Sequence, residues 1–152
     1  MIPYCWQFKN ENVEILPQKG KTVNVLGFMN AHGNQVRTFS KEGSINADFI
    51  IESINVFVST LTKITILVLD NARIHHSKMF QDQMLKWENG GLYIFYLPAY
   101  SPHLNRIETL WRHTKYRWIK PNDYQNLNVL KIALDNIWKE FGNKYTINFE
   151  LS

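Results

Sequence analysis

The chain has 152 residues, of which 45% are hydrophobic and 14% aromatic, enough to bury a sizeable core in a single domain over residues 1–152. Its 17 lysines and arginines against 13 aspartates and glutamates give a net charge of +4, which permits a polyanionic partner without requiring one. Because Cys5 is the only cysteine, an intrachain disulfide and a thiolate zinc site are excluded.

No segment has the pattern of a targeting or membrane segment. The first residues, MIPYCWQFKNE, lack the basic region and apolar run of a signal peptide, and the longest aliphatic run, at 64–69, is far too short to span a bilayer. We therefore expect a cytoplasmic protein.

The first half of the chain predicts a hairpin, a helix and a buried strand. Residues 22–40 hold two β-rich segments around the turn residues AHGN, the pattern of an antiparallel hairpin. At 46–61 the apolar residues follow the helical spacing of three and four, which indicates an amphipathic helix. The segment KITILVLD at 63–70 is continuously apolar, as strands covered on both faces are.

The second half repeats this pattern of strand and helix. GLYIFYLP at 91–98 is as apolar as the preceding strand, and between the two Ser77 can cap a helix that a glycine pair ends. The two strands are therefore expected to be parallel and joined by a helical crossover. Two further helices, at about 105–119 and 126–141, complete an α/β chain.

Asp70 is the last residue of the first parallel strand. Open α/β sheets bind ligands beyond the carboxyl ends of such strands, so the position is typical of a functional carboxylate. A purely structural explanation is also open, because an aspartate here can form an Asx turn into the segment NARIHH.

Glu108 lies in the first turn of the helix that follows the second parallel strand. Alone, it is explained by a capping box in which Asn105 is the N-cap. Adjacent parallel strands, however, would bring Asp70 and the start of this helix to one edge of the sheet. Two carboxylates there suit Mg²⁺ or Mn²⁺, which fill their other positions with water and phosphate oxygens, and so predict phosphodiester chemistry.

Two motifs resemble those of a known family. LVLDNARIHHS and, after a spacer, YLPAYSPHLNRIETLWRHTK are similar to the DDE transposases of bacterial insertion sequences, specifically the mariner-like superfamily. Weaker similarity extends over nearly the whole chain, and Arg106 departs from the motif at a proline position where arginine adds little backbone strain. The matching residues are Asp70, Asn71, Ala72, His75, Leu97, Pro98, Tyr100, Ser101, Pro102, Leu104, Asn105, Ile107, Glu108, Trp111 and Lys115.

The resemblance implies a ribonuclease H-like fold, with a mixed sheet flanked by helices, and metal-dependent DNA cleavage and strand transfer during transposition. It implies that Asp70 and Glu108 are the second and third acids of the catalytic triad and ligands of Mg²⁺ or Mn²⁺. The implied partners are DNA, as transposon ends and target, and either a second copy of the chain or an upstream transposase segment.

The first acid of the triad has no match in the sequence. In the family it lies on the first, central strand of the sheet, and this chain begins after that strand should have ended. We therefore expect an N-terminally truncated catalytic domain whose gap is filled by residues 12–16 or by a partner strand. Two carboxylates position a pair of metal ions poorly, so the chain alone is expected to be inactive or weakly active. The acids upstream of Asp70 are interpreted as surface charges: Glu11, Glu14, Glu42, Asp48 and Glu52.

The segment RHTKYRWIK at 112–120 interleaves four cations with two aromatic residues, as a surface that binds the DNA backbone would. The alternative is a solvated helix face whose cations favour the helix dipole. His75 and His76 could touch phosphate or be capping and surface residues, and the motif favours His75. The candidate DNA-binding residues are His75, Arg112, Lys115, Arg117 and Lys120.

A second class of function stays open, because a non-catalytic remnant that binds DNA or a transposase would keep the same fold. Mg²⁺- or Mn²⁺-dependent nicking of DNA would indicate the catalytic core, and binding without cleavage the remnant.

Overall fold

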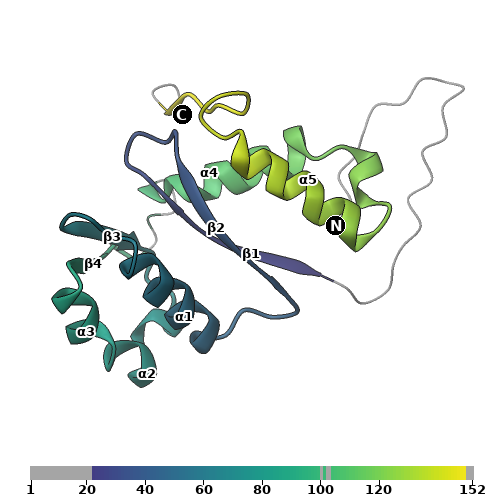
Figure 1. The fold of residues 1–152 in the computed structure, drawn as a ribbon. Coiled ribbons are helices and arrows are strands. Elements are labelled where there is room, and N and C mark those ends of the chain that lie inside the picture. Colours follow the sequence, from purple (N-terminus) through teal and green to yellow (C-terminus); the bar gives the residue numbers. More distant parts are fainter. Residues whose placement is uncertain (1–21, 100, 102–103, 150–152) are drawn as a thin grey trace, which may run out of the picture. The chain divides into compact units, whose positions relative to one another are not determined.

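The computed structural model describes residues 22–99, 101 and 104–149. The chain forms two compact units, each with its own strands and helices (Figure 1). Among the described residues, the hairpin unit consists of 22–43 together with 106–149, and the parallel-strand unit lies within Ser44–Asn105. A single domain over the whole chain stays a prediction.

The hairpin unit is built on two antiparallel strands. β1 (Val23–Met29) pairs with β2 (Val36–Glu42) along its whole length. The side-chain oxygen of Asn30 closes the turn by accepting hydrogen bonds from two backbone N–H groups, at residues 34 and 35, each at 3.1 Å. The hairpin predicted for residues 22–40 is confirmed.

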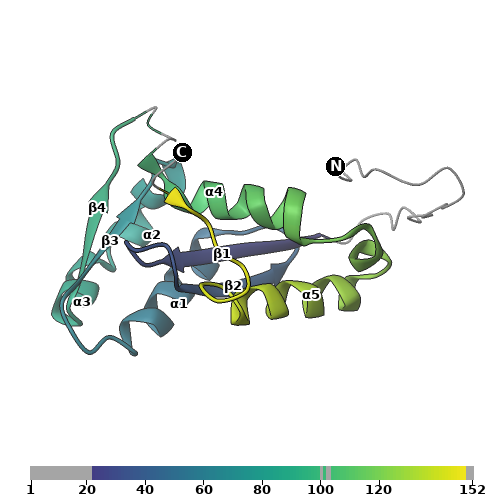
Figure 2. The same ribbon diagram turned by 90° about the horizontal axis from the view of Figure 1, so that it is seen from above.

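Two long helical segments belong to the same unit. α4 (Arg106–His113) continues into a wider π-helical turn, Thr114–Trp118, and α5 (Leu127–Lys139) starts at the cap Asn126, whose side chain accepts from the Val129 N–H at 3.0 Å. Figure 2 shows α4 and α5 running along the hairpin. The helices predicted at 105–119 and 126–141 are both present.

Tryptophans join these helices to the hairpin. A Cβ atom at Gly27 of β1 would lie 2.7 Å from the Trp111 ring, so the missing side chain leaves the space that this indole fills. The Trp111 ring in turn lies 5.5 Å from that of Trp138 on α5, edge to face. Trp111 is therefore a packing residue, and it holds the second half of α4 against β1.

The parallel-strand unit contains the predicted crossover. β3 (Thr65–Leu69) and β4 (Leu92–Tyr96) are parallel, and α1 (Ala47–Val58) precedes them. The crossover between the strands is helical but interrupted, as α2 (Lys78–Gln81) and α3 (Met84–Asn89).

The caps of these helices follow the sequence. Asn46 accepts from the Phe49 N–H at 3.2 Å at the start of α1, and Ser77 accepts from the Phe80 N–H at 3.4 Å at the start of α2. After α3, Gly91 adopts a positive φ of 83°, which turns the chain into β4. The predicted cap at Ser77 and the glycine stop are confirmed.

The core of the parallel-strand unit lies on one side of its sheet. Phe80, Trp87 and Leu92 are fully buried together with Ile54 of α1. Along both strands, however, alternate side chains are exposed, Ile66 at 66% and Phe95 at 56%. The prediction that these strands are covered on both faces is therefore wrong for the described residues, because the helices of this unit pack on one face only.

The α/β class is confirmed, and the sheet of a ribonuclease H-like fold is present in part. Among the described residues, β1 and β2 form one two-stranded sheet and β3 and β4 another. The segment expected to fill the gap, residues 12–16, lies outside the described residues. None of the described helices is long and apolar enough to cross a membrane.

Candidate functional site

Asp70 follows β3 directly, at the carboxyl end of the parallel strands. Beyond the strand pair, the Leu97 N–H donates to the Leu69 carbonyl at 2.8 Å, so the backbone is held up to the residue before Asp70. The Asp70 Oδ1 atom accepts from the Ala72 N–H at 3.2 Å, the bond of an Asx turn. Its side chain is still 49% exposed. The Asx turn is therefore real, and it leaves the carboxylate accessible.

His75 is placed against Asp70. Its Nδ1 atom lies 3.2 Å from the Asp70 Oδ1 and 3.1 Å from the Asp70 carbonyl oxygen. The ring centroid is 5.5 Å from that of Phe80, and the residue is 8% exposed. Because little of the imidazole is exposed, a phosphate would have little of the ring to contact. A direct contact between His75 and DNA therefore stays a prediction, and the burial of the ring does not support it.

Two side chains hold the backbone of His75 in place. The Tyr96 hydroxyl and the Gln81 Nε2 each donate to the His75 carbonyl oxygen at 3.0 Å, and Gln81 also donates to the Tyr96 hydroxyl at 3.2 Å. The sequence analysis missed both residues. Tyr96 had a detectable signal, because it ends β4 opposite Leu69 and so lies beside the strand end that carries Asp70.

His76 contacts other partners than His75 does. Its Nε2 contacts the Asn71 Oδ1, its ring lies 4.7 Å from that of Tyr96, and the residue is exposed. The two adjacent histidines therefore differ, since one contacts Asp70 and the other contacts the neighbouring asparagine.

Glu108 is the third residue of α4 and is exposed. The start of this helix is fixed by Arg106, whose Nη1 donates to the Ala31 carbonyl in the hairpin turn at 2.9 Å. A proline at this position, as in the family motif, could not make that bond. Asp70 and Glu108 belong to different units, so their approach to one another stays a prediction, as does the capping box with Asn105.

The donor set fits a hard divalent cation in part. Carboxylate oxygens are the ligands that Mg²⁺ and Mn²⁺ take from proteins, and Asp70 offers one on an exposed strand end. Across the described residues, however, no group of three or more histidine, cysteine, aspartate or glutamate side chains comes together. Asp70 is suited to be one ligand, and the site needs at least one further carboxylate.

The basic residues of α4 and the turn after it form an exposed surface. Within the described part of the chain, none of these four side chains forms an ion pair with a carboxylate, and the Lys115 Nζ lies 5.3 Å from the Tyr116 ring. We call this set the basic surface: Arg112, Lys115, Arg117 and Lys120. Trp118, in contrast, packs against the rings of Phe141 and Tyr145, so its role is structural.

His113 lies within this segment and has a shifted pKa. Desolvation by partial burial, reinforced by the guanidiniums of Arg117 and Arg112, holds the pKa of His113 below its usual value of 6.5. The imidazole is therefore neutral at pH 7, and the positive charge of the surface comes from its arginines and lysines.

This shift predicts how stability depends on pH. Because the unfolded chain takes up a proton at His113 more readily than the folded chain, the free energy of unfolding should fall as the pH drops below about 6.5. Replacing His113 with Gln should reduce that fall. Urea denaturation of both proteins at pH 7.5 and pH 5.5 measures it, and an equal loss in both would contradict the assignment.

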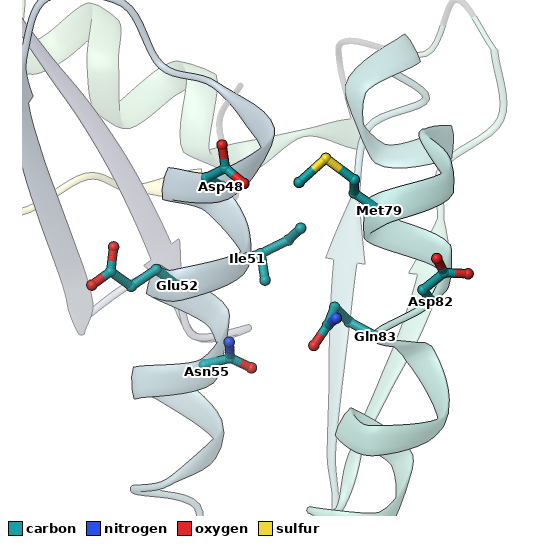
Figure 3. Close-up of a pocket in the computed structure, with 7 residues that line it drawn as sticks. All are labelled: Asp48, Ile51, Glu52, Asn55, Met79, Asp82 and Gln83. Atoms are coloured by element: carbon teal, nitrogen blue, oxygen red, sulfur yellow. The ribbon is translucent and has the colours of Figure 1, made fainter.

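An acidic groove lies between α1 and the α2–α3 segment, with a volume of about 470 Å³. Figure 3 shows Ile51 and Met79 pointing toward each other across it. Asp48, Glu52 and Asp82 also line the groove, and the carboxylates of Glu52 and Asp82 are turned away from its centre. This charge repels phosphate, so the groove is unsuited to the DNA backbone. The interpretation of Asp48 and Glu52 as exposed charges agrees with their accessibility.

Comparison with known proteins identifies the family. The family model described as DDE superfamily endonuclease matches residues 2–131, which include both candidate acids and the whole basic surface. No curated protein matches the chain.

Proposed function

Since the chain belongs to the DDE superfamily endonucleases, we propose that it is the catalytic domain of a transposase, of the mariner-like kind found in bacterial insertion sequences. The observation that carries the proposal is the position and exposure of the Asp70 carboxylate. The carboxylate stands at the carboxyl end of a parallel strand, inside the family motif, with one oxygen held by the turn and half of the side chain exposed. The reaction is the cleavage of DNA phosphodiesters and the joining of the freed ends to a target.

In this proposal Asp70 and Glu108 bind Mg²⁺ or Mn²⁺. The bound metal would activate the attacking oxygen and neutralise charge on the leaving one. The protein holds its two carboxylates on rigid elements, Asp70 on β3 and the turn that follows, and Glu108 on the first turn of α4, which Arg106 ties to the hairpin. Such fixed ligands are what a metal site requires for catalysis.

A third carboxylate is needed, and the described acids offer no good candidate. Glu42 ends β2 and forms an ion pair with Lys131 on α5, and Asp48 and Glu52 line the acidic groove. We propose that the first acid of the triad comes from a further polypeptide segment. Without it, cleavage by this chain should be slow or absent.

The basic surface is proposed to bind the DNA backbone. Each phosphate contact that releases a counterion adds about 0.9 to the slope of log affinity against log salt concentration. Replacing all four residues, Arg112, Lys115, Arg117 and Lys120, with Ala should therefore lower that slope by about 3 to 4 and weaken binding on the order of a hundredfold at low salt.

Binding of a labelled DNA duplex, followed by fluorescence anisotropy at salt concentrations from about 50 to 200 mM, measures this effect. The matched control removes the same amount of charge elsewhere on the exposed surface, by changing Lys63, Lys78, Lys86 and Lys139 to Ala. An equal loss in both variants would show that net charge alone, and not this surface, determines the binding.

The second candidate function is a non-catalytic remnant that binds DNA or a transposase. It is favoured by one observation, the absence of a three-ligand cluster in the described residues. Incubating the chain with supercoiled plasmid and Mg²⁺, Mn²⁺ or a chelator separates the two. Nicking that requires metal and is lost in Asp70→Asn supports the catalytic domain, whereas DNA binding without nicking at any metal concentration supports the remnant.

A further inference from the structure

The histidine beside Asp70 is arranged as a hydrogen-bond donor. Its Nδ1 lies 3.2 Å from the Asp70 Oδ1 and 3.1 Å from the Asp70 carbonyl oxygen, and both of these atoms can only accept. Nδ1 therefore carries the proton, donates it to the Asp70 carbonyl oxygen and lies within ion-pair distance of the carboxylate of the same residue. A donor placed this close to both atoms favours the side-chain torsions of Asp70 that keep Oδ1 beside it.

The carboxylate is held asymmetrically as a result. Oδ1 accepts from the Ala72 N–H and lies 3.2 Å from the His75 Nδ1, whereas in the described part of the chain Oδ2 has no hydrogen-bond partner. Oδ1 thus contacts groups of the protein, whereas Oδ2 can bind a ligand. Charge-assisted bonds of this kind are stronger than neutral ones, so they can hold one rotamer on an otherwise exposed strand end.

His75 is itself held rigidly enough to do this. The residue is 8% exposed, its ring packs on Phe80, and its backbone carbonyl receives bonds from Tyr96 and Gln81 at 3.0 Å each. The imidazole is therefore fixed from the ring side and from the backbone side.

We infer that His75 is a positioning residue, which holds the Asp70 carboxylate in the one rotamer that leaves Oδ2 free for the metal ion. This inference rests on the proposed function. It replaces a direct contact between His75 and DNA with an indirect role through Asp70. Groups that orient a metal-binding carboxylate typically change metal affinity or activity by 10- to 100-fold when removed.

The first test measures binding of Mn²⁺ by the intact chain. His75→Ala should weaken it about tenfold, and His75→Asn should restore most of the affinity because the Asn amide nitrogen can take the place of Nδ1. His75→Gln should not restore the affinity, because its amide nitrogen lies nearer the Nε2 position. The matched control is His76→Ala, which removes the neighbouring imidazole from the same turn without touching Asp70 and should leave the affinity unchanged.

The second test needs no metal. In the wild type the couplings between the Asp70 α and β protons should report one rotamer, and the imidazole ¹⁵N shifts should report a proton on Nδ1. His75→Ala should give averaged couplings, and His76→Ala should not. Thermal unfolding of each variant checks that the fold is kept.

The outcomes separate the two proposals. A single Asp70 rotamer in His75→Ala, or an imidazole protonated on Nε2 alone in the wild type, would overturn the positioning role. Unchanged Mn²⁺ affinity in His75→Ala would overturn it as well. If the wild type binds no Mn²⁺, the metal-dependent function is wrong, and the rotamer measurement still decides whether His75 positions Asp70.

Discussion

Replacing Asp70 with Asn should weaken Mn²⁺ binding by on the order of a hundredfold or more. The effect should exceed that of His75→Ala, because this substitution removes the charged ligand itself and not only the group that orients it. The amide keeps the shape of the side chain, and its oxygen can still accept from the Ala72 N–H. The folded structure should therefore be preserved while the charge on the ligand is removed. The same reasoning applies to Glu108→Gln on α4.

Paramagnetic broadening of backbone amide signals by Mn²⁺ measures this effect and also tests the shared site. In the wild type, signals from residues 70–75 and from residues 106–110 should broaden at the same Mn²⁺ concentration. Either substitution should remove the broadening in both segments. Glu42→Gln is the control, because Glu42 already pairs with Lys131 and should not take part. Broadening of one segment alone would show that the two acids do not share an ion.

The elements could be predicted from the sequence because their signals are local. Apolar spacing and capping side chains are contained in short segments, which is why the starts of α1 and α2 fell at Asn46 and Ser77 as expected. Asp70 was found at a strand end for the same reason. The interruption of the crossover after Gln81 was not predicted, since the apolar spacing runs through it.

Burial was harder to predict because it depends on which elements pack together. A run such as TILVL indicates a strand but does not say whether one or two layers of helices cover it, and here Ile66 and Val68 are exposed. The placement of His75 against Asp70 was not predicted for the same reason. Its burial follows from Phe80, five residues on, and its fixed backbone follows from Tyr96 on the neighbouring strand, a contact across 21 residues.

The core residue on which this site depends most is Trp87. It is fully buried, its Nε1 donates to the Asn55 Oδ1 at 2.9 Å, and its ring lies 4.9 Å from that of Phe80, which supports His75. Truncating a buried tryptophan removes apolar contacts and leaves a cavity, at a cost of about 3–5 kcal/mol. A cost of that size approaches the whole stability of many small domains.

Trp87→Ala should therefore unfold much of the parallel-strand unit, whereas Leu85→Ala on the same helix, at a side chain 69% exposed, should change the free energy of unfolding by less than about 0.5 kcal/mol. Amide hydrogen exchange distinguishes unfolding of one unit from unfolding of the whole chain. If the two units are stabilised separately, Trp87→Ala should abolish protection in β3 and β4 while β1 and β2 keep theirs. Loss of protection in all four strands together would show a single cooperative domain, and retained protection in β3 would show that this indole is not what holds the strand that carries Asp70.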